Sequence, residues 1–332
     1  MHIPVLLKEM LSQLSPQNGG TYIDATFGAG GYSKAILESA DCKVYAIDRD
    51  KTVIKFFNSL NIKYPNKIKL FIEKFSNIKT IINSTNSWHF IESSTIIQKP
   101  SSIISAEINK KKVNSKLSIE MIPHNTVDGV VFDIGVSSMQ IDEGNRGFSF
   151  LHNGPLDMRM DSSSYINASI FVNTLHEEEI ANTIYNYGGE RHSRKIARAI
   201  VNARKKKTIN TTFELADIIR SVVFRGKNKI DPATKTFQAI RIWVNDELKE
   251  LEKGIKAASE ILNKNGKIIV ITFHSLEDRI VKTFFKSLCE PRFTNHKIFF
   301  PLNKKVIKAS IEEISTNPRA RSAKLRAIQK LL

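Results

Sequence analysis

The chain has 332 residues, 41% of them hydrophobic, and a formal net charge of +17. This length and apolar content can form the core of one large domain or two ordinary domains. Two cysteines, Cys42 and Cys289, lie far apart, which argues against a disulfide framework and against a zinc site. No apolar run reaches the ~18 residues that a membrane helix needs, and no signal peptide is visible. We therefore expect a soluble, cytoplasmic protein.

The positive charge favours a polyanionic partner, because Lys and Arg side chains release counterions from phosphates. A generally Lys-rich proteome is the alternative, and the many Ile, Asn and Lys residues also fit it. We expect nucleic acid as the partner, although charge by itself does not distinguish RNA from DNA.

After a short helix at 4–14, an apolar run at 21–23 leads into a glycine-rich turn at 24–33 and a second helix. Strand, glycine turn and helix open a nucleotide-binding α/β unit. Its glycines let the backbone approach the ligand, and the helix N-terminus offers free N–H groups. The next strand, 44–47, ends in Asp48, whose carboxylate can accept both hydroxyls of a ribose.

The residues of the glycine turn indicate which nucleoside binds. Gly28 and Gly30 fit a dinucleotide fingerprint, but Ser33 takes the place of its third glycine. Asp24, at the start of the turn, is typical of S-adenosylmethionine sites, where it faces a ligand that carries an ammonium group. An NAD-type oxidoreductase and a purely structural glycine turn are the alternatives at this point.

A helix is expected at 51–60 and a third strand at 67–72, which leads to Phe75. In this class of fold the residue after the third strand covers the adenine edge, so Phe75 is a candidate cofactor contact; core packing is the alternative. Residues 84–120 contain no glycine and no clean hydrophobic period. We interpret them as an insertion without assigned chemistry, a surface loop or partial helix, with an RNA-contacting arm at 110–112 as the alternative.

The apolar run 127–133 predicts a fourth, central parallel strand that ends in Asp133. Asp24, Asp48 and Asp133 would then all lie at carboxyl ends of strands, where the active sites of open α/β sheets are found. Three strands that each place a carboxylate at one edge of the sheet are a more specific indication of an active site than the glycine turn by itself.

Charged and aromatic side chains alternate in the loop that follows. Arg146, Asp157 and Arg159 are candidate RNA contacts, because guanidinium groups pair with phosphates and aromatic rings stack on bases. A self-contained ion-pair loop is the alternative.

The pattern from 173 to 223 is helical, with a capping box at Thr174, a strongly basic helix at 192–206 and a further cap at Thr211. No strand interrupts these helices, so we expect a small bundle inserted into the α/β domain. The basic face of this bundle either binds the substrate or is exposed to solvent without a binding role.

Near-ideal 3.6-residue spacing from 237 to 262 predicts one long helix, followed by a fifth strand at 267–273. His274 and Asp278 come after this strand, at the same edge as Asp133, and are further candidate substrate contacts. No cysteine lies at a strand end, and C5-methylation of pyrimidines usually needs a cysteine nucleophile. This favours transfer onto nitrogen or oxygen, with Asp133 orienting either the amine of an unstacked base or the ammonium group of the cofactor.

Eight segments at strand ends, in loops and on later helices carry a family resemblance: 24–33, 46–50, 133–138, 146–150, 154–161, 237–245, 273–279 and 317–322. Together they resemble the family of small-subunit ribosomal RNA cytosine-N4 methyltransferases (RsmH/MraW), over nearly the whole chain apart from the insertion. The resemblance implies a cytoplasmic enzyme that transfers a methyl group from S-adenosylmethionine to N4 of a decoding-site cytidine in 16S rRNA.

The resemblance also implies a set of cofactor contacts: Gly30, Gly31, Tyr32, Asp48, Phe75, Asp133 and Gln140. In the family a histidine usually follows the glycine pair, and Tyr32 departs from that, so a contact there is expected through the backbone. Met139 stands where proline is common in the family. The family also carries an inserted helical domain, which fits the predicted bundle.

We therefore predict an α/β fold: a Rossmann-like class I methyltransferase sheet with an inserted α-helical domain. Residues 1–140 form the first part of the methyltransferase domain, 141–235 the helical substrate-binding domain, and 236–332 the second part. Asp133 is the expected catalytic residue, no metal is expected, and the oligomeric state is open. The rivals are an NAD-type oxidoreductase, a non-catalytic RNA-binding or assembly factor, and a DNA amine methyltransferase.

Overall fold

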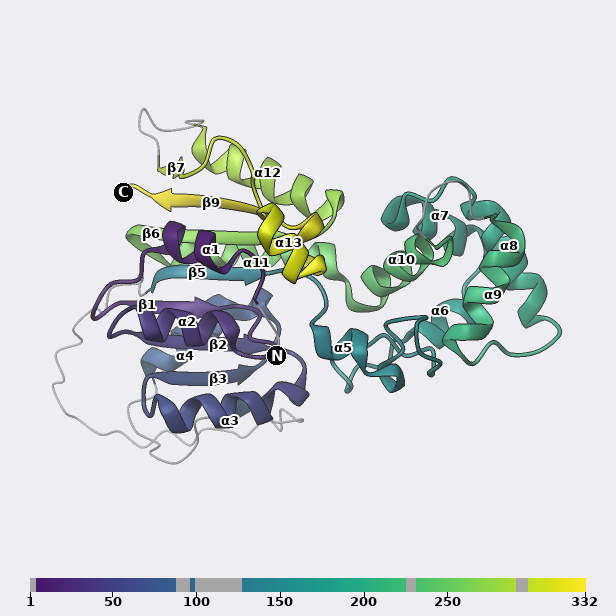
Figure 1. The fold of residues 1–332 in the computed structure, drawn as a ribbon, viewed down its shortest axis with the longest axis horizontal. Helices are drawn as coiled ribbons and strands as arrows, with labels where there is room; N and C mark the ends of the chain where they lie inside the picture. Colours follow the sequence, from purple (N-terminus) through teal and green to yellow (C-terminus); the bar gives the residue numbers. More distant parts are fainter. Residues whose placement is uncertain (1–3, 88–95, 99–126, 225–230, 291–297) are drawn as a thin grey trace, which may run out of the picture.

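The computed structural model describes residues 4–87, 96–98, 127–224, 231–290 and 298–332. The described chain forms a sheet with helices on both faces and, beyond one end of the strands, a separate helical lobe (Figure 1). No helix among the described residues is both long enough and apolar enough to cross a bilayer.

Within the described residues the sheet has nine strands: β1 Thr21–Asp24, β2 Lys43–Asp48, β3 Ile68–Ile72, β4 Ile96–Gln98, β5 Val127–Asp133, β6 Leu262–Thr272, β7 Phe299–Pro301, β8 Ile307–Lys308 and β9 Lys324–Lys330. Their order is β4-β3-β2-β1-β5-β6-β9-β7, and β8 also pairs with β9. The pairs from β4 to β6 are parallel, whereas β9 pairs antiparallel with β6, β7 and β8. The predicted Rossmann-like α/β sheet is confirmed.

The strand order reverses direction between β1 and β5, and ligands of open α/β sheets bind at such a switch point. In the register, Asp24 pairs with Ala46 of β2 and Val131 of β5. Asp48 and Asp133 end the two strands that flank β1. The three aspartates therefore lie at one edge of the sheet, as predicted.

The helices are α1 Leu7–Leu14, α2 Gly31–Ser39, α3 Ile54–Lys63, α4 Ile78–Ser87, α5 Ser138–Asp142, α6 Ala168–Thr174, α7 Glu177–Gly188, α8 Ser193–Arg204, α9 Thr212–Val222, α10 Ala233–Asn245, α11 Glu247–Ile261, α12 Ser275–Cys289 and α13 Ile311–Thr316. α1, α2 and α3 cover one face of the sheet; α4, α11 and α12 cover the other. Val131 and Phe132 show why: successive strand residues point to opposite faces, and these two belong to different cores.

The helical lobe has a core of its own, built by α6 to α10 around Phe171, Ile184, Ile200 and Ile219. The predicted inserted bundle is therefore present. Its last helix, α10, begins before the boundary expected at residue 235, runs past it to Asn245 and contributes Ile240 to this core.

The single long helix predicted at 237–262 was wrong. α10 and α11 are separate helices, joined at Asp246, whose φ of 49° places it in the left-handed region. Val244 packs in the helical lobe and Leu251 packs on the sheet, so the chain turns between two cores. The apolar spacing continues across this turn, and periodicity alone therefore did not reveal it.

Two smaller features also differ from what was expected. Thr174 does not cap α7; it ends α6, and its hydroxyl donates to the Ile170 carbonyl, while His176 is the N-cap of α7. Within the predicted insertion, β4 forms a short parallel strand beside β3, too short to show a period. Residues 110–112 lie outside the described residues.

Candidate active site

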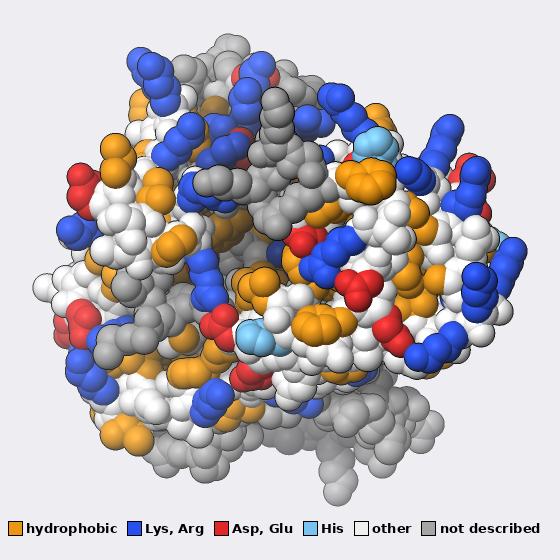
Figure 2. Space-filling view, turned by 45° about the vertical axis from the view of Figure 1, so that its right-hand side comes forward, with side chains coloured by type: hydrophobic (Ala, Val, Ile, Leu, Met, Phe, Trp, Pro, Cys, Tyr) orange, Lys and Arg blue, Asp and Glu red, His pale blue; other side chains and the backbone are white. Residues whose placement is uncertain are grey.

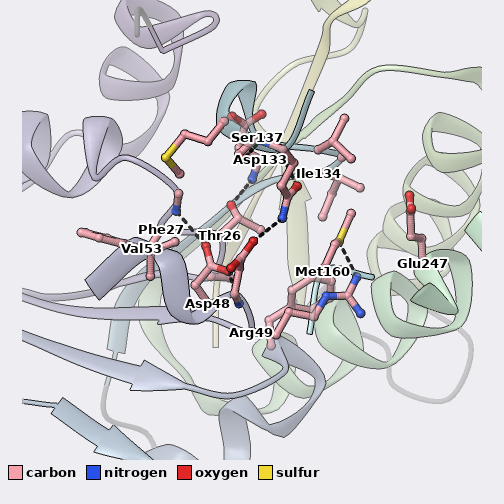
Figure 3. A pocket seen from close by; sticks show the side chains of 18 of the residues that line it. Thr26, Phe27, Asp48, Arg49, Val53, Asp133, Ile134, Ser137, Met160 and Glu247 are labelled. Carbon is pink, nitrogen blue, oxygen red and sulfur yellow. Dashed lines mark hydrogen bonds between the residues drawn. The ribbon is translucent and has the colours of Figure 1, made fainter. Parts of the chain in front are cut away.

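A cavity of about 350 Å³ opens at the carboxyl ends of the central strands, between the sheet and the helical lobe. Figure 3 shows Asp48 and Asp133 among the side chains that line it, with Glu247 on the side of the helical lobe. Six of the seven expected cofactor contacts line this cavity: Gly31, Tyr32, Asp48, Phe75, Asp133 and Gln140. Gly30, the seventh, has a φ of 79° and is the residue at which the turn enters α2.

Asp24 stabilises the glycine turn through hydrogen bonds to its C-terminal end. Its side chain is fully buried, and its Oδ2 accepts hydrogen bonds from the Ser33 backbone N–H (3.1 Å) and hydroxyl (2.7 Å). The prediction that Asp24 faces a ligand was therefore wrong. Ser33, the residue that breaks the dinucleotide fingerprint, supplies this carboxylate with its partner.

The N-terminal segment closes one side of the cavity. A Cβ added to Gly31 would lie 2.3 Å from Cγ of Pro4, so only glycine lets this segment approach. The hydroxyl of buried Tyr32 donates to the Val5 carbonyl at 2.6 Å. The side chain of Tyr32 therefore fastens the segment that carries Pro4 and Val5, both of which line the cavity.

Asp48 is tied to the backbone on both sides. Its Oδ2 accepts from the Gly28 N–H at 2.8 Å, and its Oδ1 accepts from the Asp50 N–H at 2.9 Å. Burial raises its pKa to about 6. The carboxylate is thus fixed next to the glycine turn and can accept further hydroxyl donors.

Asp133 presents an unsatisfied carboxylate to the cavity. Its backbone N–H donates to the Thr26 hydroxyl at 2.7 Å. Among the described residues its Oδ1 has no hydrogen-bond partner, because the nearby Tyr32 hydroxyl donates its hydrogen to the Val5 carbonyl. Burial, followed by repulsion from Asp24, raises its pKa to about 8. A buried acceptor without a partner is costly, which indicates a ligand donor at this position.

Phe75 lines the cavity and also packs into the core. Its ring meets Phe132 edge to face with centroids 5.5 Å apart, and a Cβ on Gly254 would lie 2.4 Å from it. Gln140, by contrast, is held by polar contacts: its Oε1 accepts from the Ser137 N–H, and its Nε2 donates to Asp50 at 2.8 Å.

Arg146, Asp157 and Arg159 form ion pairs within the protein and do not line the cavity. Arg146 contacts the buried Asp50 carboxylate at 2.9 Å and donates to the Arg159 carbonyl. Arg159 binds Asp157 through two hydrogen bonds, of 2.8 and 2.7 Å. The pair of Arg159 with Asp157 corresponds to the self-contained ion-pair loop, the alternative to direct RNA contacts, whereas the carboxylate partner of Arg146 lies outside this loop.

His274 and Asp278 separate in the structure. His274 lines the cavity as the N-cap of α12, and its Nδ1 accepts from the Glu277 N–H at 3.3 Å. Asp278 instead binds Arg326 (2.7 Å) and Lys324 (3.2 Å) of β9 and does not line the cavity.

Sequence patterns did not reveal Arg241, Glu247 and Arg49 as cavity residues. Arg241 binds Glu247 through two hydrogen bonds, of 2.8 and 2.9 Å, across the turn between α10 and α11. Arg49 donates to the Asn245 carbonyl at 2.9 Å, which joins the sheet to the helical lobe. Neither contact has the i, i+4 spacing that marks ion pairs on a helix.

One group of side chains has the composition of a metal site: donor atoms of Glu247, His274 and Glu277 lie within 4.8 Å of one another. Because Nδ1 of His274 accepts a backbone hydrogen bond, neutral imidazole carries its hydrogen on Nε2. Arg241 already binds both oxygens of Glu247. This group therefore fits hydrogen bonding better than metal coordination.

A family model described as the MraW methylase family matches residues 1–331. "Ribosomal RNA small subunit methyltransferase H" of Wolbachia sp. subsp. Brugia malayi (strain TRS) is 78% identical over 331 residues, covering 99% of each chain. The protein of the same name in Ehrlichia ruminantium (strain Gardel) is 59% identical over 336 residues, again with 99% of each chain covered. Among solved structures, an rRNA methylase from Streptococcus thermophilus is similar over 100% of both chains, with 7% identity and a TM-score of 0.42.

Proposed function

The chain belongs to the MraW methylase family, an S-adenosylmethionine-dependent family, and on this premise we propose that it methylates N4 of a decoding-site cytidine in 16S rRNA. The observation that carries this proposal is the partnerless Asp133 carboxylate in a cavity at the switch point of the sheet. The names of its relatives, which act on small-subunit ribosomal RNA, support the same substrate.

The cavity fits S-adenosylmethionine in three respects. Gly31 offers backbone without a side chain, Asp48 offers a carboxylate for ribose hydroxyls, and Phe75 offers a ring for adenine. S-adenosylmethionine, when bound, supplies a methyl carbon that its positively charged sulfur makes electrophilic. The carboxylates of the cavity favour such a cation over a pyrophosphate.

Asp133 would act on the target amine. An exocyclic amine is a weak nucleophile, because its lone pair is delocalised into the base. A carboxylate that accepts one N–H orients the amine, and it can also take up the proton that the amine loses. A pKa of about 8 suits proton uptake near neutral pH. Neither cysteine lines the cavity, so attack on ring carbon through a covalent intermediate lacks its nucleophile.

His274 would recognise the same base. Its Nε2–H has no aligned acceptor among the described residues: Oε1 of the buried Glu277 lies 2.9 Å away, within ion-pair distance but outside hydrogen-bond geometry. Cytosine presents an acceptor, N3, next to the amine, whereas uracil presents a donor there. A donor from His274 beside an acceptor from Asp133 therefore matches cytosine and opposes uracil.

The helical lobe would hold the RNA backbone. One face of α8, extended by a residue just outside its N-terminus, carries exposed cations: Arg191, Arg194, Lys195 and Arg198. Lys and Arg side chains also gather along the outer edge of this lobe in Figure 2. Such a surface releases counterions from phosphates, as RNA binding in the cytoplasm would require.

The decisive variant is Asp133→Ala. We expect it to lose methyl transfer to small ribosomal subunits while it keeps the fold and binds S-adenosylhomocysteine. Near-normal transfer would contradict the role of Asp133. Calorimetric titration with NAD tests the oxidoreductase alternative, and an unchanged methylation pattern in rRNA from cells without the gene would favour a non-catalytic factor.

A further inference from the structure

Glu250 is a buried carboxylate of the cavity that the proposed chemistry does not use. It lies in α11, only 5% of the residue is exposed, and it lines the cavity. Its Oε1 faces Lys74 at 4.0 Å, and its Oε2 has no hydrogen-bond partner in the part of the chain that the structure describes. An ionisable group in such a position is costly unless a donor meets it.

The surroundings of Glu250 place it beside Phe75. Gly254 follows Glu250 by one helical turn, so both residues lie on the same face of α11. Gly254 is the residue against which the Phe75 ring packs, with room for no Cβ between them. The carboxylate of Glu250 therefore belongs to the part of the cavity wall where Phe75 lies.

We propose that Glu250 recognises the adenine of the cofactor by accepting a hydrogen bond from its exocyclic amine. This inference rests on the proposed function, in which Phe75 contacts the adenine ring. A carboxylate only accepts hydrogen bonds, and the N6 amine is the exocyclic donor of adenine. Hypoxanthine carries a carbonyl oxygen at that position. This oxygen and the Glu250 carboxylate are both acceptors, so no hydrogen bond can form between them.

The size of the discrimination follows from the burial of this carboxylate. A hydrogen bond to a charged group, made where water is excluded, changes affinity about 10- to 100-fold when it is lost. Wild-type protein should therefore bind S-adenosylhomocysteine at least about tenfold more tightly than S-inosylhomocysteine. A glutamine at this position offers an N–H as well as an oxygen, so it can pair with either base.

The test is calorimetric titration of the full chain with both ligands, in wild type, Glu250→Gln and Glu260→Gln. Glu260 lies in the same helix but pairs with Lys79 at the surface, so Glu260→Gln is the matched control. We expect Glu250→Gln to reduce the preference to within about threefold, and the control to keep the wild-type preference.

The outcomes separate this inference from the function on which it rests. If S-adenosylhomocysteine binds and Glu250→Gln keeps the full preference, the role of Glu250 is wrong and the methyltransferase assignment stands. If S-adenosylhomocysteine does not bind wild type, the cofactor assignment falls, and this inference falls with it. If Glu250→Gln does not fold, titration of the wild-type protein tests the inference. The N6,N6-dimethyl analogue of S-adenosylhomocysteine, which lacks the N6 donor, must then bind about tenfold more weakly than S-adenosylhomocysteine itself.

Discussion

Asp133 links cofactor binding to pH. Burial and the neighbouring Asp24 raise its pKa to about 8, so most free protein molecules carry a proton there at pH 7. A positively charged sulfur favours the ionised carboxylate. Raising the pH therefore removes a proton that opposes binding, and the affinity for S-adenosylmethionine should increase with pH and level off above about pH 8.

The magnitude follows from the fraction of Asp133 that is ionised. With a pKa of about 8, roughly one molecule in a hundred is ionised at pH 6, one in eleven at pH 7 and one in two at pH 8. If the ionised form binds far more tightly than the protonated form, affinity rises by up to about ninefold from pH 6 to 7 and about fivefold from pH 7 to 8. The free energy of unfolding of the free protein depends on pH in the opposite direction. Because folded Asp133 holds its proton more tightly than the unfolded chain does, this free energy falls as the pH rises through about 8.

Calorimetric titration at pH 6, 7, 8 and 9 measures this linkage, with Asp133→Asn as the control. The α-amino group of the ligand titrates near pH ~7.7–8.0, so the readout is the ratio of wild-type to variant affinity. Proton release at pH 7, measured in buffers of different ionisation enthalpy, should be larger for wild type. An equal pH profile for both proteins would refute the linkage.

Three further predictions concern the scaffold, each measured by urea unfolding. Gly31→Ala forces its Cβ against Pro4 and should cost about 1–3 kcal/mol; an unchanged midpoint would show that the N-terminal segment does not pack there. Arg146→Ala leaves the buried Asp50 carboxylate without its guanidinium and should cost about 3 kcal/mol, whereas a loss below about 0.5 kcal/mol, the range of an exposed pair, would contradict its burial. Asp246→Gly relieves a left-handed residue and should stabilise by about 0.5–1 kcal/mol; destabilisation would mean that the turn between α10 and α11 needs the Asp side chain.

The sheet could be predicted from sequence because its strands are short apolar runs bounded by polar residues. Asp48 and Asp133 each end such a run, and parallel pairing brings those ends to one edge. The direction in which a side chain points at that edge could not be predicted in the same way. Asp24 turns away from the cavity because Ser33, nine residues later, binds it from α2.

Contacts between distant segments account for most of what sequence analysis missed. Arg146 was expected to contact RNA or, alternatively, to pair with an aspartate of its own loop, but it binds Asp50, 96 residues earlier. α10 and α11 read as one helix because the apolar period continues through Asp246, although the two halves enter different cores. The cavity residues Arg241 and Glu247 lie on either side of that turn, so their ion pair could not be predicted from a pattern that joins α10 and α11 into one helix.

The most direct measurement is mass spectrometry of the nucleosides of small-subunit rRNA after incubation of ribosomal subunits with the protein and methyl-labelled S-adenosylmethionine. We predict label in N4-methylcytidine at one decoding-site position, and none with Asp133→Ala. Label at C5 of a pyrimidine, or in N4-methylcytidine with Asp133→Ala as with wild type, would contradict direct transfer to an amine that Asp133 holds.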